Sequence, residues 1–389
     1  EEDIASIIYT SGTTGFSKGV VLTHKNLVWD ARQCHTIQPV DETYRFLSIL
    51  PMAHTYENTL GLLLPLMFGA QVYYLDRVPT PKLLVPAMQK IRPTVVLSVP
   101  LIIEKIYKSQ VLPKFTSSKL MSKLYQFAPA RKLFNRLAGK KLMETFGGEL
   151  KFFGIGGSKL DGTVEQFLRE AKFPYAIGYG LTETAPMAAG SNPSQTFLQG
   201  VGPVMEGVQI KINDPDNSGQ GEIWIKGPNV MKGYYKRPEL TAETFTEDGW
   251  FKTGDLGSFD KKNRLAIRGR IKTMILGASG ENIYPEEIES IINNFRFVNE
   301  SLVVENSGKL VAMVHFNMEE LEKQYQKLKD QAGNYKEKIN DYIEEQKQEL
   351  RDYVNARVNN FSKLQLVLVQ HEPFEKTPTH KIKRFLYCK

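Results

Sequence analysis

The sequence predicts an α/β protein with a mostly parallel sheet in its first half, a small β subdomain after it and an α+β region at the end. Three observations support this. Short β-branched or aromatic runs alternate with helical patterns up to about residue 180. Glycines become frequent from Gly200 to Arg268, and a long charged helical stretch then reaches about Asn360. We therefore divide the chain into residues 1–199, 200–270 and 271–389.

The first region supplies the strands and helices of the predicted parallel sheet. Its strand-like runs are Ile4–Tyr9, Val20–Leu22, Phe46–Leu50, Val72–Leu75 and Thr94–Val99. A helical pattern spans His24–Gln33, with Thr23 as its N-cap, and another spans Pro81–Ile91, with Pro81 in the first turn.

The later regions have a different pattern of residues. Residues Asn213–Gly221 (NDPDNSGQG) predict a turn, and Glu222–Lys226 alternates like a half-buried strand. Beyond residue 270, the predicted elements are a helix from Pro285, strands at Ser301–Val304 and Leu310–Phe316, the long charged helix, and a last strand at Leu364–Val369.

Composition excludes some classes of protein. The chain of 389 residues is 41% hydrophobic and 24% charged, an ordinary globular balance. Its net charge of +7 suits anionic ligands or an anionic membrane surface, and no nucleic-acid-binding signature is present. Cys34 and Cys388 lie at opposite ends without metal-ligand spacing, which predicts a reduced, cytoplasmic protein.

One segment concentrates positive charge. Residues 105–143 carry ten Lys or Arg and no Asp or Glu, interleaved with Leu, Phe and Tyr. A solvated helical face explains this pattern, and so does an interfacial helix that contacts anionic lipid at the membrane periphery.

The stretch YTSGTTGFSK, Tyr9 to Lys18, places small hydroxyl residues and glycines directly after a strand. Closely spaced backbone N–H groups form an anion cradle, to which hydroxyls add donors and Lys18 adds charge. The loop is not a Walker A motif, because Lys18 lies between Ser17 and Gly19. It is a candidate phosphate site, and a flexible turn is the alternative.

Two further motifs carry candidate ligands. In GYGLTET, Gly178 and Gly180 flank Tyr179, whose ring a flat ligand could approach, and Glu183 lies where its carboxylate could hold Mg²⁺. The alternative is a strand end with an ordinary exposed glutamate.

In TGDLG, Asp255 could accept hydrogen bonds from ribose hydroxyls or form an Asx-type turn. Lys381 lies in a Pro-stiffened basic tail, where a solvated lysine is the alternative.

Together these motifs resemble one family from end to end. The matching segments, in order, are YTSGTTGFSKGV, LTHKNL, LPMAHTYENT, GGSKL, GYGLTETAP, WFKTGDLG, GRIK, GENIYPEEIE and KTPTHKIKR. The chain resembles the adenylate-forming superfamily and is most similar to bacterial long-chain fatty acyl-CoA synthetases. The resemblance implies a large N-terminal α/β domain, incomplete at its start, with a β subdomain and a small mobile C-terminal lid.

The resemblance also implies roles for individual residues. The β- and γ-phosphates of ATP would be held by Thr10, Ser11, Gly12, Thr13, Thr14, Gly15 and Lys18. Adenine would be framed by Gly156, Gly157, Ser158, Gly178, Tyr179 and Gly180. Thr182 would contact the α-phosphate, Glu183 the Mg²⁺, and Asp255 the ribose, with Arg270 nearby.

Other implied roles concern the C-terminal lid and the acyl and CoA tunnel. Lys381 would bridge the carboxylate and α-phosphate during adenylation, and Lys272 would be the hinge of the lid. His54 would lie beside the acyl and CoA tunnel, as would Gly277 and Gly280 after the lid rotates.

The expected activity is therefore ATP- and Mg²⁺-dependent activation of a long-chain fatty acid, followed by thioester formation with CoA. The alternatives are a fatty acyl-AMP ligase that loads a carrier protein, and a non-catalytic nucleotide- or acyl-binding relative. His380 replaces the family's usual Gly, which we interpret as a subfamily mark. The family's segment ahead of the phosphate loop is missing, so we expect a fragment or a truncated relative. A homodimer is also expected.

Overall fold

The computed structural model describes residues 1–11, 17–77, 79–116, 118–277, 281–328, 335–377 and 382–388. The chain divides into two compact units, the first holding Glu1–Thr10 with Lys18–Ile267 and the second built on Arg268–Lys389. Within the described ranges, no helix combines the length and the apolarity needed to cross a bilayer. The division at residues 199 and 270 stays a prediction.

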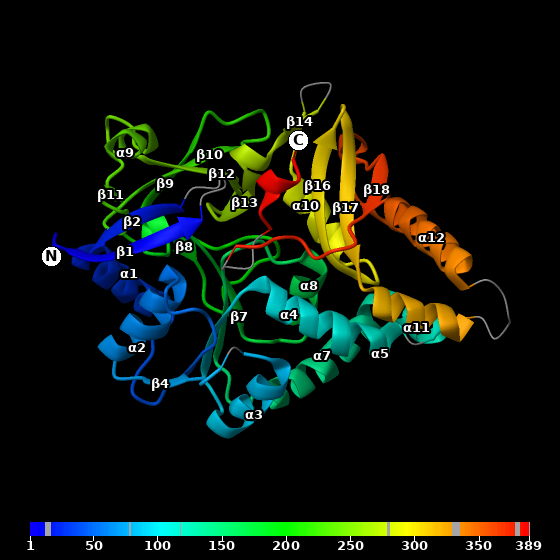
Figure 1. Ribbon diagram of the computed structural model, residues 1–389. Helices are drawn as coiled ribbons and strands as arrows, with labels where there is room; N and C mark the ends of the chain where they lie inside the picture. The colour runs from blue at the N-terminus through cyan, green and yellow to red at the C-terminus, as the bar shows by residue number, and fades with distance from the viewer. Residues whose placement is uncertain are drawn as a thin grey trace. The chain divides into compact units, whose positions relative to one another are not determined.

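A six-stranded sheet in the order β4–β3–β5–β6–β7–β8 organises the first unit. Figure 1 labels its strands β4, β7 and β8. All neighbouring strands are parallel except β7 and β8. The strands are β3 (Arg45–Ser48), β4 (Gln71–Tyr74), β5 (Val95–Ser98), β6 (Phe152–Ile155), β7 (Tyr175–Tyr179) and β8 (Ala189–Gly190). The predicted α/β class is confirmed, and three of the predicted strand runs overlap β3, β4 and β5.

Helices and helical turns connect these strands. They are α1 (His24–Ile37), η1 (Glu57–Leu63), α2 (Leu64–Met67), α3 (Pro81–Ile91), α4 (Pro100–Ile106), η2 (Tyr107–Val111), α5 (Leu112–Thr116), α6 (Lys119–Gln126), α7 (Ala128–Thr145), α8 (Gly162–Glu170) and η3 (Thr182–Thr184). Helix α1 begins as predicted: the Asn26 N–H donates to Thr23 Oγ1 at 3.2 Å, and the Thr23 N–H donates to Asn26 Oδ1 at 2.9 Å. Helix α3 begins at Pro81 as predicted.

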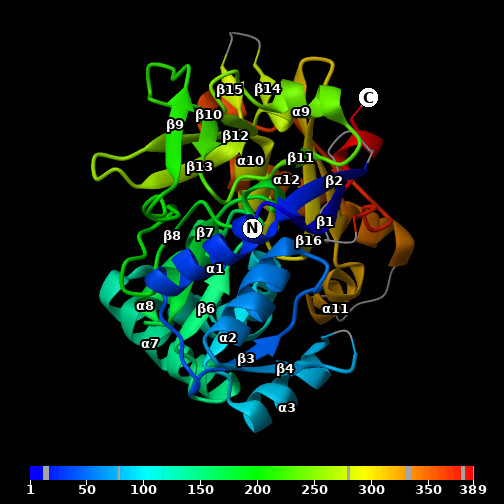
Figure 2. The ribbon, with the colours of Figure 1, turned by 90° about the vertical axis from the view of Figure 1, so that its left-hand side faces the viewer.

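The sheet is buried on both faces, as parallel sheets in α/β proteins are. On β5, Val96 belongs to the core beneath α4, α7 and α8, whereas Val95 and Leu97 belong to the opposite core, which contains residues of α1 and α2. Figure 2 is viewed from the side on which α1 and α2 lie over the sheet.

The first two predicted strands do not join this sheet. Strands β1 (Ile4–Ser11) and β2 (Ser17–Thr23) form a separate sheet with β11 (Gly233–Tyr234), which pairs antiparallel with β2. Their assignment to the parallel pattern was therefore wrong. The link between β1 and β2 is too short for the crossover that parallel neighbours require.

The predicted β subdomain contains a four-stranded sheet in the order β13–β12–β10–β9. Its elements are β9 (Gln209–Asn213), β10 (Gly221–Lys226), β12 (Phe251–Phe259) and β13 (Leu265–Arg270), and helix α9 (Pro238–Thr244) precedes β12. The predicted turn joins β9 to β10, where Asp216 Oδ1 accepts from the N–H groups of Ser218 at 2.8 Å and Gln220 at 3.0 Å.

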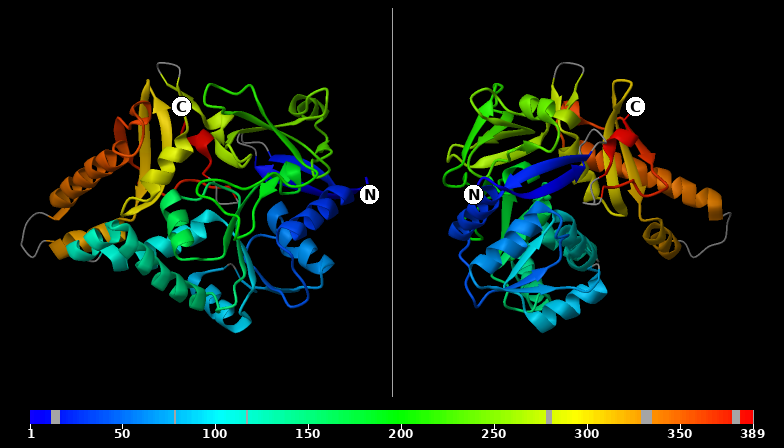
Figure 3. Two further views of the ribbon diagram at one scale, coloured as in Figure 1. Left: turned by 180° about the vertical axis from the view of Figure 1, so that it is seen from behind. Right: turned by 60° about the vertical axis from the view of Figure 1, so that its left-hand side comes forward.

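The second unit is built on the three-stranded sheet β16–β17–β18, with the helix α12 beside it (Figure 3). Its elements are η4 (Ile271–Thr273), β14 (Ile275–Leu276), β15 (Asn282–Ile283), α10 (Pro285–Asn293), β16 (Val298–Asn306), β17 (Lys309–Phe316), α11 (Met318–Leu328), α12 (Tyr335–Asn355), η5 (Asn360–Ser362), β18 (Leu366–Val369) and η6 (Arg384–Leu386). The predicted α+β character is confirmed.

Ion pairs of Lys376 and Arg384 fasten the C-terminal tail to this second unit. Lys376 pairs with Glu300 of β16, and Lys376 also forms an isolated β-bridge with Ile382. Arg384 binds the carboxylate of Glu289 on α10. Both flanks of the segment that contains Lys381 are thus attached to the unit's own sheet and helix.

Candidate functional site

Polar and glycine residues of the first unit gather where β6 and β7 end. Open α/β sheets commonly bind ligands at the carboxyl ends of their parallel strands. Gly156, Gly157 and Ser158 follow β6 directly, and the Gly156 N–H donates to the Ser98 carbonyl oxygen of β5 at 3.1 Å. Gly157 has φ of 88°, which favours glycine. A Cβ on Gly156 would lie 3.3 Å from the ring of Tyr56.

Tyr179 ends β7, and its hydroxyl donates to Asp255 Oδ2 at 2.9 Å. Both side chains are buried, with 8% of Tyr179 and 4% of Asp255 exposed. Tyr179 and Asp255, which the sequence predicts to bind the same nucleotide, are thus in contact. Asp255 lies on β12 of the four-stranded sheet. Gly180 is required here, because an added Cβ would lie 1.8 Å from the Pro186 carbonyl oxygen.

The turn that carries Thr182, Glu183 and Thr184 follows β7. Its backbone is held by the buried amide of Asn229, whose Nδ2 donates to the carbonyl oxygen of Thr184 at 3.1 Å and to that of Met187. The Met231 N–H donates to the Glu183 carbonyl oxygen at 2.8 Å. The carboxylate of Glu183 is therefore displayed from a fixed turn.

Helix α1 adds two buried supports, one for residues 228–230 and one for Met187, which follows the turn. Asn26 Nδ2 donates to the carbonyl oxygens of Pro228 at 2.7 Å and Val230 at 2.9 Å. Asp30 is fully buried, and its Oδ1 accepts from the Met187 N–H at 3.2 Å. Burial raises the pKa of Asp30 well above its ordinary value.

Tyr234 links two of the predicted residues, and the sequence analysis missed it. Its hydroxyl donates to Glu183 Oε1 at 2.8 Å, and the Lys18 ammonium lies 4.8 Å from the centre of its ring. The sequence signal was the GYY triplet at Gly233 to Tyr235, which lies outside the motifs that we assigned to chemistry.

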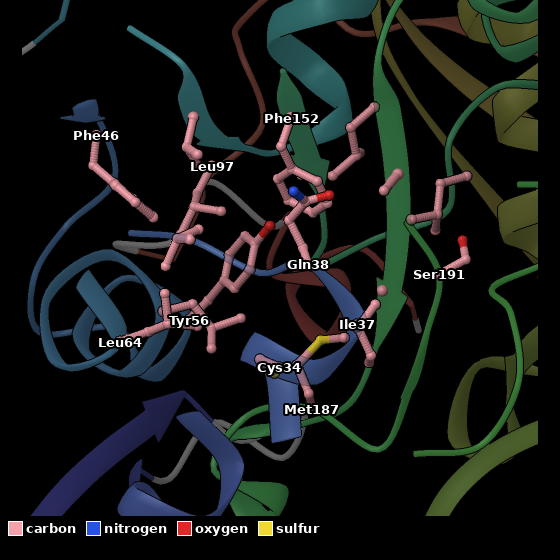
Figure 4. Close-up of a pocket in the computed structure, with 18 residues that line it drawn as sticks. Cys34, Ile37, Gln38, Phe46, Tyr56, Leu64, Leu97, Phe152, Met187 and Ser191 are labelled. Carbon is pink, nitrogen blue, oxygen red and sulfur yellow. The ribbon is translucent and has the colours of Figure 1, made fainter. Parts of the chain in front are cut away.

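An apolar pocket lies on the α1 and α2 face of the sheet (Figure 4). The pocket, including its open mouth, has a volume of about 570 Å³. Its walls include Phe46, Val95, Leu97, Phe152, Gly154, Ile177 and Gly178 of the sheet, Cys34, Ile37 and Gln38 at α1, Tyr56, Leu60 and Leu64 from residues 56–64, and Met187 and Ser191. Among these, Gly178 is one of the residues predicted to frame adenine, and Gly154 lies two residues before another, Gly156.

His54 contacts a residue that lines this pocket. His54 Nδ1 accepts from the Tyr56 N–H at 3.2 Å, and the Tyr56 ring projects into the pocket (Figure 4). Glu57, next in the chain, is 1% exposed, and one of its carboxyl oxygens has no hydrogen-bond partner in the described part of the chain. Burial raises the pKa of Glu57 to about 7, although a hydrogen bond with Ser48 lowers it in part.

The remaining predicted site residues are not brought together in the first unit. Thr10 and Ser11 end β1, whereas Gly12, Thr13, Thr14 and Gly15 lie outside the described residues, as do Gly280 and Lys381. Arg270, Lys272 and Gly277 belong to the second unit, where Lys272 is exposed on the turn η4. Their predicted roles stay predictions.

The sequence of the chain is similar to those of known proteins. Residues 1–235 match the model of a family described as AMP-binding enzyme. The chain is 31% identical to the peroxisomal long chain acyl-CoA synthetase 6 of Arabidopsis thaliana, over 98% of this chain and 59% of that protein. It is 32% identical to long-chain-fatty-acid–CoA ligase 1 of Saccharomyces cerevisiae, over 79% of this chain and 47% of that protein.

A solved structure shares the fold. The ATP-bound RpMatB–BxBclM chimera B1 superposes with a TM-score of 0.76 and 26% identity, covering 99% of this chain and 68% of that one. The chain spans about half to three fifths of the length of the two curated relatives.

Proposed function

Because this chain belongs to the AMP-binding enzyme family, we propose that it forms the catalytic part of an ATP-dependent acid–thiol ligase that acts on long-chain fatty acids. The observation that carries the proposal is the position of the apolar pocket. Its lining includes Gly154 of β6 and Gly178 of β7, which lie close to the polar residues at the ends of these strands. A hydrocarbon tail in the pocket would direct its carboxylate toward a nucleotide bound at those residues.

The nucleotide would be bound by the residues at the strand ends. Gly156, Gly157, Ser158 and Gly178 to Gly180 would frame adenine, and Asp255 would accept hydrogen bonds from the ribose. The Tyr179 hydroxyl supports this role, because its hydrogen bond fixes the orientation of the Asp255 carboxylate. Thr182 would contact the α-phosphate, and Lys18 with the loop from Thr10 would hold the phosphates that leave as pyrophosphate.

The donor set around Glu183 fits Mg²⁺. Magnesium is usually held by one or two carboxylates together with substrate phosphates. The described residues contain no group of three or more His, Cys, Asp or Glu that could hold a metal alone. Glu183 would therefore hold the cation jointly with the phosphates of ATP. The cation would supply charge that offsets the repulsion between carboxylate and phosphate.

The two half-reactions would use different residues of the lid. Lys381 would stabilise the charge that builds up as the fatty acid carboxylate attacks the α-phosphate. Rotation about Lys272 would then withdraw Lys381, and Gly277 and Gly280 would approach the tunnel near His54. The thiol of CoA would attack the acyl-adenylate, which releases AMP.

Two other functions compete with this proposal. A carrier protein could replace CoA as the acceptor; a 30% identical relative in Arabidopsis thaliana is named as a long-chain-fatty-acid–[acyl-carrier-protein] ligase. The more similar relatives named above are called CoA synthetases or ligases, which favours CoA. A non-catalytic nucleotide-binding protein is the third reading, and the ordered turn that displays Glu183 counts against it.

Pyrophosphate release tests the proposal. The chain is incubated with Mg–ATP and fatty acids of increasing length, with and without CoA. We expect release that rises with chain length and turns over only with CoA. ATP binding without release for any fatty acid would favour the non-catalytic reading, and acyl transfer to carrier protein but not to CoA would favour that acceptor.

A lysine variant separates the half-reactions. Lys381→Ala should abolish adenylation yet leave thioester formation from preformed acyl-adenylate largely intact, since Lys381 is withdrawn in the second step. Equal loss of both activities would contradict the assigned role.

We further infer that the cytoplasmic enzyme contacts anionic membrane through residues 105–143. The inner face of α7 packs into the core through Phe134 and Leu142, whereas Leu133 and Leu137 on its outer face are 58% and 62% exposed. Arg136 and Lys140 lie on the same outer face by helical spacing. Exposed leucines beside basic residues are typical of helices that lie on acidic lipid.

Flotation with vesicles tests this contact. We expect the chain to float with phosphatidylserine-containing vesicles and not with pure phosphatidylcholine. Leu133→Ser with Leu137→Ser should reduce the bound fraction, whereas Leu366→Ser, which changes an exposed leucine on the second unit, should not. Equal binding by both variants would overturn the assignment. The expected homodimer stays a prediction.

A further inference from the structure

Tyr234 joins the cationic and anionic residues that the proposed function assigns to Mg–ATP. Its hydroxyl donates to Glu183 Oε1 at 2.8 Å, and its ring lies beneath the Lys18 ammonium, 4.8 Å from the ring centre. The side chain is 8% exposed. A single tyrosine therefore contacts one residue from the phosphate loop and one from the turn after β7.

The backbone holds Tyr234 firmly in this place. Its strand β11 pairs with β2, in register with Val20, and the Tyr234 N–H donates to Thr241 Oγ1 at 2.9 Å. Gly233 has φ of 147°, and an added Cβ there would lie 2.6 Å from Thr241 Cγ2. The Tyr235 N–H donates to the Gly19 carbonyl oxygen at 2.7 Å. The backbone is thus held at Tyr234 and at the residues before and after it, which fixes the position of the ring.

Each of the two contacts has a distinct physical effect. A hydroxyl that donates to a carboxylate forms a charge-assisted hydrogen bond, which is stronger than a neutral one and fixes the carboxylate's orientation. An ammonium over an aromatic face is attracted by the ring's electron density. One tyrosine therefore orients both side chains, so that neither Lys18 nor Glu183 would need to change its orientation when the nucleotide binds.

We propose that Tyr234 is a positioning residue that pre-orients the Glu183 carboxylate and the Lys18 ammonium for Mg–ATP. The inference rests on the proposed function, because that function assigns Mg²⁺ to Glu183 and phosphates to Lys18. A preorganised pair costs little reorganisation on binding, which is how such polar groups contribute most in enzyme sites. Tyr234 itself touches neither the metal nor the reacting atoms in this assignment.

Two substitutions separate the two contacts. Tyr234→Phe removes the hydroxyl that binds Glu183 and keeps the ring under Lys18. Tyr234→Leu removes both. Tyr235→Phe is the matched control, because it deletes the hydroxyl of the neighbouring tyrosine, which is 39% exposed. Thermal unfolding of each variant reports whether the fold is intact.

Calorimetry of a non-hydrolysable ATP analogue at several Mg²⁺ concentrations is the measurement. For Tyr234→Phe, we expect the Mg²⁺ concentration at half-effect to rise about tenfold, the lower end for loss of a residue that orients a metal ligand. Affinity for the metal-free analogue should stay unchanged. Tyr234→Leu should also weaken metal-free binding, because Lys18 loses its support, and Tyr235→Phe should change neither quantity.

The outcomes distinguish this inference from the proposed function. If the parent chain binds Mg–ATP and Tyr234→Phe shows the parent's Mg²⁺ dependence, the positioning role is overturned and the proposed function stands. A lower unfolding temperature with unchanged Mg²⁺ dependence would likewise reduce Tyr234 to a packing residue. If the parent binds no nucleotide, the proposed function fails, and the inference fails with it.

Discussion

The two faces of the six-stranded sheet are built from the same strands but differ in how they are filled. On β6, Phe153 is fully buried in the core beneath α7 and α8, whereas its neighbour Phe152 lines the pocket on the α1 and α2 face. The first face is close-packed, and the second contains a cavity. We conclude that one face chiefly stabilises the fold and the other is open to a ligand.

The composition of the two faces explains the difference. Phe146, Phe153 and Phe173 pack edge to face on the first, with ring centres 5.4 to 5.6 Å apart. On the second, the strands present Gly154 and Gly178, beside which the side chains of Tyr56 and Met187 approach closely. The two faces thus differ in the residues that neighbouring strands present to them.

The largest expected effect comes from truncating the packed face. Phe153→Ala should lower the free energy of unfolding by roughly 3 to 5 kcal/mol, because it leaves a cavity among Phe146 and Phe173. Phe152→Ala, one residue away, should cost less, since its ring already borders empty space. Denaturant unfolding of both variants measures the contrast, and equal losses would show that the two faces contribute alike.

A second effect concerns a carboxyl buried near each face. Glu57 is near the pocket and Glu104 packs near α8, and burial raises the pKa of each to about 7. Glu104 Oε1 accepts from the Asp161 N–H at 3.1 Å. Between the ordinary value of 4.5 and about 7, the folded chain keeps a proton on each group that the unfolded chain releases. The free energy of unfolding therefore falls as pH rises through this window and levels off above it.

Glutamine variants isolate this pH dependence. From about pH 4 to pH 8, Glu57→Gln should gain stability relative to the parent by on the order of 3 kcal/mol, because the amide does not titrate. Glu104→Gln should show the same direction, and the double variant the flattest profile. Denaturation across pH measures it; a Glu57→Gln profile parallel to the parent's would mean that Glu57 is ionised in the fold.

The smallest expected effect compares one glycine from each face. A Cβ on Gly139 of α7 would lie 2.8 Å from the Ala171 carbonyl oxygen, which cannot move easily. A Cβ on Gly154 would meet the side chains of Tyr56 at 2.7 Å and Leu97 at 3.1 Å, which border the pocket and can shift into it. Gly139→Ala should therefore cost roughly 1 to 2 kcal/mol of stability.

Gly154→Ala should cost less stability and instead reduce the pocket. Pyrophosphate release with long fatty acids should fall more than release with short ones. A variant that loses stability without any change in chain-length dependence would place the acyl chain elsewhere.

The sequence predicted the elements whose signals are local. The capped start of α1 and the buried strand β5 followed from neighbouring residues alone. The wrong placement of β1 and β2 arose because their partner, β11, lies in a distant part of the sequence. Strand pairing across such a separation leaves no periodic signal.

The candidate site was likewise predicted only in part from the sequence. The order of the motifs predicted Tyr179 and Asp255 for one nucleotide, and the structure brings these two side chains into contact. Tyr234 was missed because its importance lies in what it touches, not in its residue type. The resemblance implied an acyl tunnel near His54 but not the residues that line the pocket, because these depend on the spacing between helices and sheet.

The attachment of the C-terminal tail has a mechanical consequence. Lys376 and Arg384 clamp the two flanks of Lys381 to β16 and α10. A segment that is fixed at both ends moves together with the unit to which it is attached. Any movement of the second unit would therefore carry both flanks of Lys381 with it. Breaking the Arg384–Glu289 ion pair would weaken the attachment of the tail to α10, and the tail would then follow movements of the unit less closely.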